Sequence, residues 1–246
     1  MVMHHKLPDF ASTRHLPCIL NPSAITRLDT VATAEEAQSI FFGDDHPVEV
    51  TEKIDGANCG IYAFPAINPD VVMVRNRSHI LSRGFTAKTP AQAQWASIWG
   101  WVYEHREAFE RLACTVNGVV YGEWMHFVHG MAYTRLPAKF IAHSLWDMDE
   151  KLWVCPSLAR GLLTAAGFSL PAVLTTRPAS LEELADLAKG PAQWAEGCRE
   201  GVYVKVGDGR RTTHRFKLVG PDFEPGKHFG SGARNKVVSG TPDKSR

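Results

Sequence analysis

The sequence lacks several patterns that would assign it at once to a class of protein. Its five cysteines are scattered over 246 residues and form no Cys-x-x-Cys pair. An odd number of scattered cysteines argues against a disulfide framework and a structural zinc site, and is typical of a reducing compartment. No stretch reaches the roughly 18 apolar residues that cross a bilayer, and the first ten residues lack the apolar core of a signal peptide. These absences predict a soluble, cytoplasmic protein with no membrane partner.

A strong net charge is also missing, because the formal net charge is +1. Any binding of nucleic acid must therefore come from a local basic surface. The chain contains no glycine-rich phosphate loop of the Walker type and no Ser-His-Asp arrangement. His126 and His129 follow Glu123 closely, but no second pair of ligands stands at zinc spacing, so we expect ordinary loop histidines, with contact to RNA or phosphate as the alternative. We expect His143 to be a semi-buried residue in a strand.

The pattern of caps and apolar residues predicts an α+β domain of antiparallel sheets with flanking helices. Capping boxes begin at Thr33 and Ser180, and Thr89 combines a cap with a proline at the first helical position. The predicted helices cover residues 33–43, 89–113, 158–166 and 180–190. Runs rich in valine and aromatic residues predict strands at 47–53, 59–64, 71–75, 118–124, 140–148, 152–154, 201–206 and 214–219. Several of them are separated by glycine turns, which favours hairpins over parallel crossovers.

One domain over residues 1–220 accounts for this length of chain. From residue 221 to 246 the composition changes to glycine, serine, lysine and arginine with few apolar residues. We expect a mobile, solvated tail there. The alternative is that its basic residues contact phosphates: Lys227, Arg234, Lys236, Lys244 and Arg246. The 27 residues after Val219 are too few for a separate OB-fold or helical domain.

Lys53 is the strongest candidate for chemistry. It stands in the sequence Glu-Lys-Ile-Asp-Gly-Ala-Asn over residues 52–58. Apolar residues alternate along the preceding strand, so the side chain of Lys53 points away from the face that carries Val48 and Val50. Gly56 permits a tight turn with close approach of the backbone. A neutral amine attacks phosphorus well, whereas an ammonium does not, so such a site must lower the pKa of the lysine or remove its proton. The alternative is a surface lysine paired with Asp55.

Four further motifs follow Lys53 in a fixed order: Val-Arg-Asn-Arg-Ser at 74–78, Tyr-Gly-Glu-Trp at 121–124, Leu-Trp-Asp at 145–147, and Glu-Gly-Val-Tyr-Val-Lys at 200–205 with Arg-Phe-Lys at 215–217. This order resembles the covalent nucleotidyltransferase superfamily of polynucleotide ligases and capping enzymes. Within it, Glu-Lys-x-x-Gly-x-Asn resembles the RNA ligase family typified by the second RNA ligase of bacteriophage T4. The resemblance covers residues 47–219 and implies a nucleotidyltransferase ligase core, which is ATP-grasp-like.

The resemblance implies how adenosine would be bound. Lys53 would form a phosphoamide with AMP, and Glu52 would read the adenine amino group. Glu123 would hold the ribose hydroxyls. Trp146 occupies the position of an aromatic residue that stacks on adenine, where phenylalanine is usual.

The resemblance also implies contacts with the nucleic-acid end. Asn58 stands where this family has an asparagine that is needed for sealing adenylylated ends. Arg77 is similar to the arginine that contacts the nucleotide and the nucleic-acid phosphate. Arg75 is the alternative, because the local alignment fits either residue.

Metal and phosphate ligands complete the implied site. Glu200 would bind the catalytic Mg²⁺, or Mn²⁺ in its place, and Asp55 supplies a second hard oxygen ligand. Arg215 and Lys217 would bind the triphosphate, although the family has two lysines there and Arg215 departs from it. Together with Lys205 they would stabilise the charge that grows on the α-phosphate and would lower the pKa of Lys53.

The resemblance therefore predicts an ATP-dependent RNA ligase that adenylylates a 5′-phosphate and seals it to a 3′-hydroxyl. The expected partners are RNA ends or a nicked duplex, and a repair-partner protein. A minimal ATP-dependent DNA ligase is the enzymatic alternative, and a GTP-specific capping enzyme fits the motif around Lys53 less well. A non-catalytic module that binds nucleic-acid ends is the alternative from another class.

Overall fold

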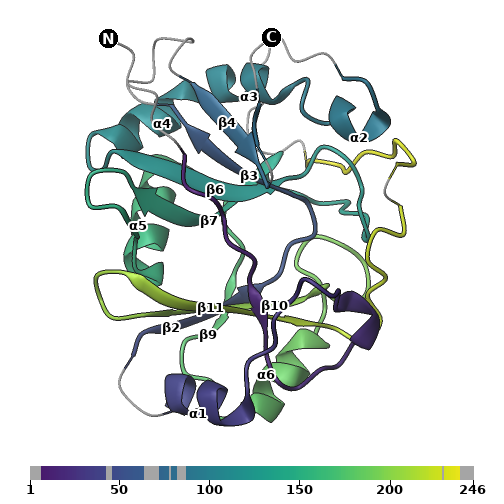
Figure 1. Cartoon of the computed structure of the whole chain (residues 1–246). Helices are drawn as coiled ribbons and strands as arrows, with labels where there is room; N and C mark the ends of the chain where they lie inside the picture. The colour runs from purple at the N-terminus through teal and green to yellow at the C-terminus, as the bar shows by residue number, and fades with distance from the viewer. Residues whose placement is uncertain are drawn as a thin grey trace.

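The protein consists of two β-sheets that face each other between outer layers of helices (Figure 1). This computed structural model describes residues 7–42, 46–63, 72–77, 79–81, 87–228 and 230–238. The predicted helix stop at Gly43 and the basic residues Lys244 and Arg246 lie outside this described part. The α+β class with antiparallel sheets is confirmed.

The first sheet has five strands in the order β1-β11-β10-β2-β9. All neighbours in it are antiparallel except β1 and β11. Helices α1 and α6 cover its outer face, where Val50, Val204 and Phe216 contribute to a core with Leu184 of α6. The strands are β1 (Arg14–His15), β2 (Val48–Glu52), β9 (Val173–Thr175), β10 (Gly201–Gly207) and β11 (Thr212–Val219), and the helices are α1 (Ala34–Phe42) and α6 (Leu181–Ala188).

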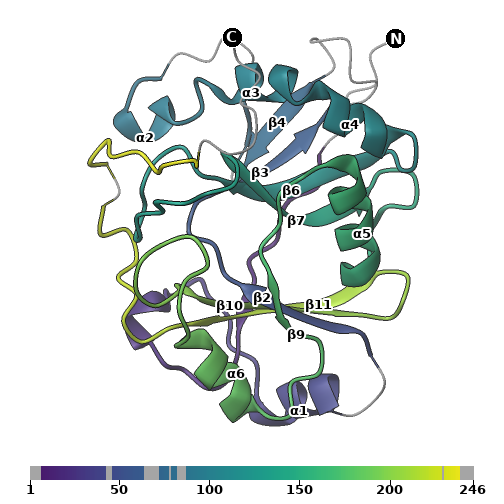
Figure 2. The same cartoon turned by 180° about the vertical axis from the view of Figure 1, so that it is seen from behind.

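The second sheet has six antiparallel strands in the order β5-β4-β3-β6-β7-β8. Its outer face packs against α3, α4 and α5 through a core that includes Trp101, Trp124 and Phe140 (Figure 2). The strands are β3 (Ala57–Tyr62), β4 (Met73–Asn76), β5 (Ile80–Leu81), β6 (Gly118–Trp124), β7 (Phe140–Asp147) and β8 (Leu152–Trp153). The helices are α2 (Pro90–Ala93), α3 (Ile98–Glu104), α4 (Arg106–Ala113) and α5 (Pro156–Ala166), and a 3-10 turn covers Pro22–Ala24.

The predicted caps are confirmed, but one helix is not continuous. The hydroxyls of Thr33, Thr89 and Ser180 each accept a hydrogen bond from the backbone N–H three residues later. The single helix predicted over 89–113 is wrong, since α2, α3 and α4 occupy that region. The chain turns after α2, where the carbonyl of Gln94 accepts a hydrogen bond of 2.6 Å from the indole of Trp124. That contact replaces a helical hydrogen bond, so packing against β6 interrupts the helix.

Each of the eight predicted strands has a counterpart, and β6 has the predicted bounds. Sequence patterns did not predict β1, β5 or β9, which are two or three residues long. Strands of that length are too short to show an alternating pattern, and the equally short β8 was predicted only from the run of strand-forming residues at 152–154. Among the described residues, no helix is long and apolar enough to cross a membrane.

The described part of the C-terminal segment is anchored to the domain, in contrast to the predicted mobile tail. Most of its side chains are exposed, but its backbone forms bridges from Arg234 to Phe127 and from Val237 to Leu136. Figures 1 and 2 show this yellow segment running along one side of the molecule, from the sheet that contains β11 toward α2. Hydrogen bonds to the loop after β6 hold it there.

Candidate active site

A cavity of about 580 Å³ lies between the two sheets. Residues from β2, β10 and β11 line one side, and residues from β3, β6 and β7 line the other. Residues 10–13 and part of the segment that follows α2 complete its wall. Six of the sequence-predicted site residues lie on this wall: Glu52, Lys53, Asn58, Arg77, Glu123 and Lys217. Glu200 is not part of the wall but contacts Lys53.

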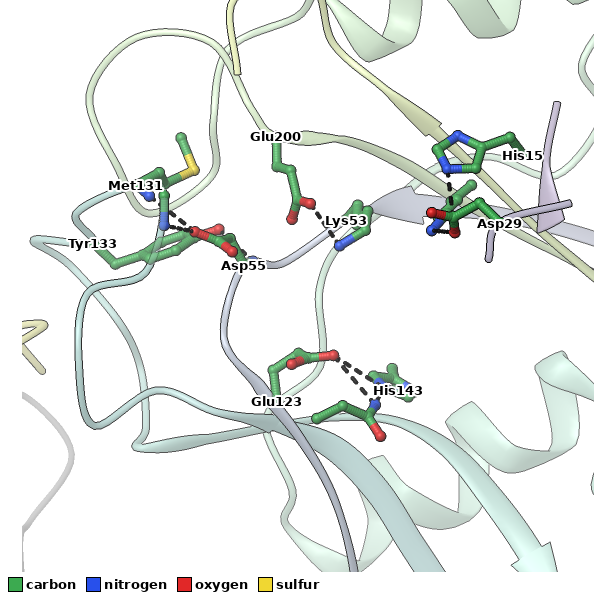
Figure 3. A network of polar contacts seen from close by, with 12 residues as sticks. His15, Asp29, Lys53, Asp55, Glu123, Met131, Tyr133, His143 and Glu200 are labelled. Carbon is green, nitrogen blue, oxygen red and sulfur yellow. Dashed lines mark hydrogen bonds and ion pairs between the residues drawn. The ribbon is translucent and has the colours of Figure 1, made fainter. Parts of the chain in front are cut away.

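Lys53 lies directly after β2, where the chain passes from the first sheet to the second (Figure 3). Its N–H donates to the carbonyl of Gly201, which fixes the backbone beside β10. Glycine is required at Gly201, because a Cβ there would lie 2.0 Å from the carbonyl oxygen of Leu218. At Gly56 a Cβ would lie 2.5 Å from the sulfur of Met125, so the bend after Lys53 also needs glycine. The close approach of the backbone predicted at Gly56 is present, but residues 53–56 form a bend between strands of two different sheets and not a tight turn.

Carboxylates, not cations, surround the amine of Lys53. Its Nζ lies 2.7 Å from Oε1 of Glu200, and its side chain is 26% exposed. Burial lowers the pKa of Lys53, but the charges of Glu200, Glu123 and Asp55 outweigh burial and hold this pKa above its usual value. The expectation that neighbouring cations lower this pKa is therefore wrong. With this raised pKa Lys53 is an ammonium, and an ammonium is not a nucleophile.

Glu200 has the properties of a ligand for a hard cation. Burial raises its pKa to about 7, against the effect of the Lys53 ammonium. Its Oε1 contacts Lys53, whereas its Oε2 is buried and has no hydrogen-bond partner among the described residues. Mg²⁺ is commonly held by one or two carboxylates together with substrate phosphates, so a single carboxylate with a free oxygen fits it. The described residues contain no group of three or more His, Cys, Asp or Glu side chains that could hold a metal without substrate.

Asp55, the second predicted metal ligand, instead holds the loop after β6. Its Oδ2 accepts hydrogen bonds from the N–H groups of Gly130 and Met131, at 2.5 and 2.9 Å. Its own N–H donates to the hydroxyl of Tyr133. Figure 3 shows its carboxylate turned toward this loop and away from Lys53. The geometry assigns Asp55 to loop positioning, because its carboxylate is already used by two backbone donors.

Replacing Asp55 is therefore expected to destabilise the fold. Asp55→Ala leaves two backbone donors without an acceptor, which costs about 1–3 kcal/mol of unfolding free energy. Asp55→Asn retains one acceptor oxygen and should lose clearly less. Urea unfolding of the two variants measures the difference. Equal stability of Asp55→Ala and the unmutated protein would contradict the loop-holding role.

The register of the first sheet decides which of its polar residues reach the cavity. Thr51, Tyr203 and Lys217 stand opposite one another on β2, β10 and β11, and all three line the cavity. The next row on the same face, two residues further from Lys53, consists of Glu49, Lys205 and Arg215. None of these three residues is part of the cavity wall as described. Lys205 and Arg215 therefore lie outside the site predicted for them.

Lys205 and Arg215 have other partners. Lys205 Nζ lies 2.6 Å from Glu49 Oε1 and donates to the carbonyl of His143. The guanidinium of Arg215 lies between two aromatic rings, 4.4 Å from the centre of Phe10 and 4.6 Å from that of Trp153. A planar guanidinium stacks on aromatic faces, whereas an ammonium does not stack in this way, which explains an arginine where the family has lysine.

Lys217 reaches the cavity but is paired with a residue from outside the predicted motifs. Its Nζ donates to Asp29 Oδ1 at 2.7 Å. Burial raises the pKa of Asp29, but hydrogen bonds from Lys217 and Thr26 hold this pKa below its usual range. His15 lies 3.6 Å from the same carboxylate, and burial with the charge of Lys217 lowers its pKa to about 4, so it is neutral. A phosphate bound by Lys217 would compete with Asp29.

His143 is a site residue that sequence patterns did not identify. On β6 and β7, Tyr121 opposes Ser144 and Gly122 opposes Ala142, so His143 is the extra residue of a β-bulge. Bulges redirect side chains beside active sites, and this one places the imidazole in the cavity wall. Burial lowers the pKa of His143, which favours a neutral ring. A bulge depends on pairing between strands and leaves no signal in one sequence.

Glu123 and His143 lie across from Lys53 in Figure 3, and Asn58 contacts both of them, so that the three form a polar cluster. Asn58 Nδ2 donates to Glu123 Oε1 at 3.3 Å and lies 3.3 Å from His143 Nε2. Strand register explains the first contact, because Asn58 on β3 is directly opposite Glu123 on β6. The structure thus brings together two predicted residues and one unpredicted residue.

Trp146 and Arg75 point to places other than the cavity. Trp146 packs against Trp153, with ring centres 5.3 Å apart, in a cluster that contains Tyr121. Arg75 is buried, donates to the carbonyl of Leu7 at 2.6 Å and pairs with Asp9. The predicted stacking position of Trp146 is therefore not supported by its placement. Of the two candidate arginines, it is Arg77 that lines the cavity.

Glu52 lies on the cavity wall with one oxygen engaged. Its Oε2 accepts a hydrogen bond from the N–H of Gln193, and its Oε1 is buried without a partner among the described residues. Burial raises the pKa of this carboxyl. An unengaged acceptor at this position can take a donor from a ligand.

A comparison with models of protein families assigns the chain. The RNA ligase family model matches residues 46–219, which is more than half of the chain. The protein therefore belongs to the RNA ligase family. The match does not test the closer likeness to the bacteriophage T4 type, which stays a prediction. A comparison with curated proteins found no match.

Solved structures of an RNA ligase from Naegleria gruberi share the fold. The structure of that enzyme with pyrophosphate aligns with a TM-score of 0.52 and 19% identity over 87% of this chain. A mutant form with ATP and manganese aligns with a TM-score of 0.52 and 22% identity, also over 87% of this chain. The aligned parts are 61% and 62% of the Naegleria chains, so this chain spans less than two thirds of their length.

Proposed function

We propose that this protein is an ATP-dependent RNA ligase that joins RNA ends through a lysyl-AMP intermediate. The observation that carries the proposal is Lys53, which lies in the cavity between the sheets with Glu200 beside it and Glu123 across from it. Membership of the RNA ligase family supports this assignment. ATP and manganese bound to the Naegleria enzyme support ATP with a divalent metal as the cofactors.

In the first step the neutral amine of Lys53 attacks the α-phosphorus of ATP. An N–P bond forms, the bond from the α-phosphorus to the bridging oxygen breaks, and pyrophosphate leaves with that electron pair. Lys53 must first lose a proton, because its pKa is raised. Glu200 is the base in contact with it, at 2.7 Å, and has a pKa of about 7. The attack is therefore expected to accelerate as the pH rises from 6 toward 9.

The adenosine would bind against the second sheet. His143 offers a flat face to the adenine, worth about 1–3 kcal/mol by analogy with stacking in nucleic-acid complexes. It replaces Trp146 in this role, because His143 lines the cavity and Trp146 does not. Glu123 would accept hydrogen bonds from the ribose hydroxyls, and the unengaged Oε1 of Glu52 would accept one from the adenine amino group.

The phosphates would bind to Lys217 and Arg77, the two predicted cations on the cavity wall besides Lys53. Lys217 would exchange Asp29 for a phosphate oxygen, which carries more negative charge. Glu200, through its unengaged Oε2, would hold Mg²⁺ or Mn²⁺ together with these phosphates. When bound, the metal supplies positive charge beside the α-phosphate, where negative charge grows during attack.

The later steps transfer AMP and seal the ends. An oxygen of the RNA 5′-phosphate attacks the phosphorus of lysyl-AMP, the N–P bond breaks, and Lys53 recovers its electron pair. The 3′-hydroxyl then attacks the 5′-phosphorus, a phosphodiester forms, and AMP leaves. Asn58, at 3.3 Å from both Glu123 and His143, would orient the adenylylated end in this last step.

A sealing assay tests the proposal. The protein is incubated with Mg²⁺, ATP and RNA strands that carry a 5′-phosphate and a 3′-hydroxyl, on a bridging strand or free. We expect joined RNA with ATP, little with GTP, and less product from matched DNA ends. Efficient sealing of DNA but not RNA would identify a DNA ligase instead. Binding of RNA ends without any adenylylated protein or RNA would identify a non-catalytic module.

A further inference from the structure

Two segments that are far apart in the sequence form a basic face beside the cavity. Residues 125–139 and 225–238 contain five lysines and arginines, three histidines and no acidic residue. The whole chain has a net charge of only +1, so the remainder of the chain is net negative. We call this surface the basic face, and its lysines and arginines are Arg135, Lys139, Lys227, Arg234 and Lys236.

Asn235 fixes the two segments together. Its Oδ1 accepts from the N–H of Tyr133 at 2.8 Å, and its Nδ2 donates to the carbonyls of Met125 and Phe127 at 3.2 and 2.9 Å. Backbone hydrogen bonds from Val128 to Ala233, from Leu136 to Lys236 and from Lys236 to Tyr133 extend the contact. Specific hydrogen bonds therefore hold this part of the segment against the loop after β6.

Because Asn235 points inward, its neighbours point outward. Side chains alternate along an extended segment, so Arg234 and Lys236 share the opposite side and are both exposed. Burial, then the charges of Arg234 and Lys139, lower the pKa of His126, which places these cations near one imidazole. No ion pair joins Lys139, Arg234 or Lys236 to any residue in the described part of the chain. Their charges are therefore open to a partner.

The basic face adjoins the proposed catalytic lysine. His129, which belongs to the first segment, lines the cavity, and its carbonyl accepts from the N–H of His228 at 2.7 Å. The same loop is held by Asp55, two residues after Lys53. A polyanion that crosses the face would thus reach the cavity wall at His129.

We propose that the basic face binds the phosphate backbone of the RNA strand whose end enters the cavity. This proposal rests on the proposed function for the identity of the substrate, RNA, and adds the surface along which the RNA strand lies. Lys139, Arg234 and Lys236 have no ion pair in the described part of the chain, whereas Lys227 is paired with Glu224. Three such cations fit a chain of phosphates, which is recognised by charge and at low sequence specificity. The C-terminal segment then acts as part of the substrate site.

The charge variant Arg234→Ala/Lys236→Ala tests the proposal. Its affinity for a fluorescent, 5′-phosphorylated RNA is measured by anisotropy over a series of salt concentrations. Two lost phosphate contacts to a single strand reduce the slope of log K against log salt by about 1.4, and we expect affinity near 0.15 M salt to fall roughly 10-fold. The matched control Arg177→Ala/Lys189→Ala removes two exposed cations elsewhere and should leave both quantities unchanged.

A second variant removes the side chain that holds the C-terminal segment against the loop after β6, without changing the net charge. Asn235→Ala breaks three hydrogen bonds of the segment and is expected to weaken RNA binding in the same direction, with labelling of Lys53 by ATP retained. Unchanged affinity and slope in the charge variant, or an equal loss in the control, would overturn the proposal. Adenylylation is measured separately without RNA. A protein that binds RNA through this face but forms no adenylate would refute the proposed function and leave the face supported.

Discussion

Lys53→Ala is expected to lose formation of the protein–AMP adduct altogether. The amine is the nucleophile of the proposed first step, so its removal should lower the rate by about 10³-fold or more. Denaturing gels after incubation with α-labelled ATP and Mg²⁺ measure this directly. The exposed Lys189, which pairs with Asp186 on the surface, provides a control, and Lys189→Ala should label normally. Full labelling of Lys53→Ala would show that another residue carries the nucleotide.

Lys53→Arg separates the chemistry of this residue from its charge. A guanidinium keeps the ion pair with Glu200 and so preserves the local electrostatics. It does not lose its proton in a protein, so it cannot attack phosphorus. We expect Lys53→Arg to match the unmutated protein in thermal unfolding and Lys53→Ala in the absence of label. Destabilisation of Lys53→Arg would point to a structural cause instead.

The same variants should retain the last step. RNA that already carries a 5′-adenylate needs no lysine nucleophile, because the 3′-hydroxyl attacks the RNA phosphate itself. Sealing of pre-adenylylated RNA by Lys53→Ala is therefore expected to continue. Loss of this reaction together with the first step would indicate that Lys53 also positions the ends.

Glu200→Gln is expected to increase the neutral fraction of the Lys53 amine but to slow its adenylylation by ATP. Glu200 is one of the carboxylates that raise the pKa of Lys53, whereas burial lowers it. Removing this charge should therefore lower the pKa and increase the neutral amine at a given pH. Adenylylation should nevertheless fall, by roughly 100-fold or more, because both the proposed base and the proposed metal ligand are lost. A structural defect alone would not make the amine more reactive while it reduces turnover.

Acylation of Lys53 by a small amine-reactive reagent, without ATP or metal, reports the pKa of Lys53 through the pH dependence of the reaction. Peptide mass spectrometry reports the modified fraction of Lys53 alone. We expect the titration of Lys53 to move to lower pH in Glu200→Gln. Glu196 lies on the surface close by in the sequence, and Glu196→Gln should leave the titration unchanged. An unshifted titration in Glu200→Gln would contradict the assigned electrostatics.

Local signals in the sequence predicted most of the regular structure. Caps at Thr33, Thr89 and Ser180 depend on residues within one turn, so they can be recognised without knowledge of the fold. The prediction of a single helix over 89–113 was wrong, because a tertiary contact from Trp124 to the carbonyl of Gln94 interrupts it. Packing between distant segments overrides local helix propensity there.

In the candidate site too, the sequence predicted some features, and pairing between distant strands decided the others. The resemblance grouped Lys205, Arg215 and Lys217 in one site, but it did not show how far each lies from Lys53. Pairing between strands decides this, and it places Lys217 in the cavity and Lys205 opposite Glu49. Lys53 lies on the cavity wall directly after β2, and its short motif was recognised in the sequence without knowledge of the fold. The bulge at His143 could not be predicted, since it exists only in the pairing of β6 with β7.

Locating the covalent adduct in the unmutated protein tests the central claim most directly. The protein is first discharged with pyrophosphate, then incubated with α-labelled ATP and Mg²⁺, digested, and mapped by mass spectrometry. The account predicts an acid-labile, base-stable AMP adduct on the peptide that contains Lys53. Absence of any adduct after discharge, or an adduct on another residue, would contradict it.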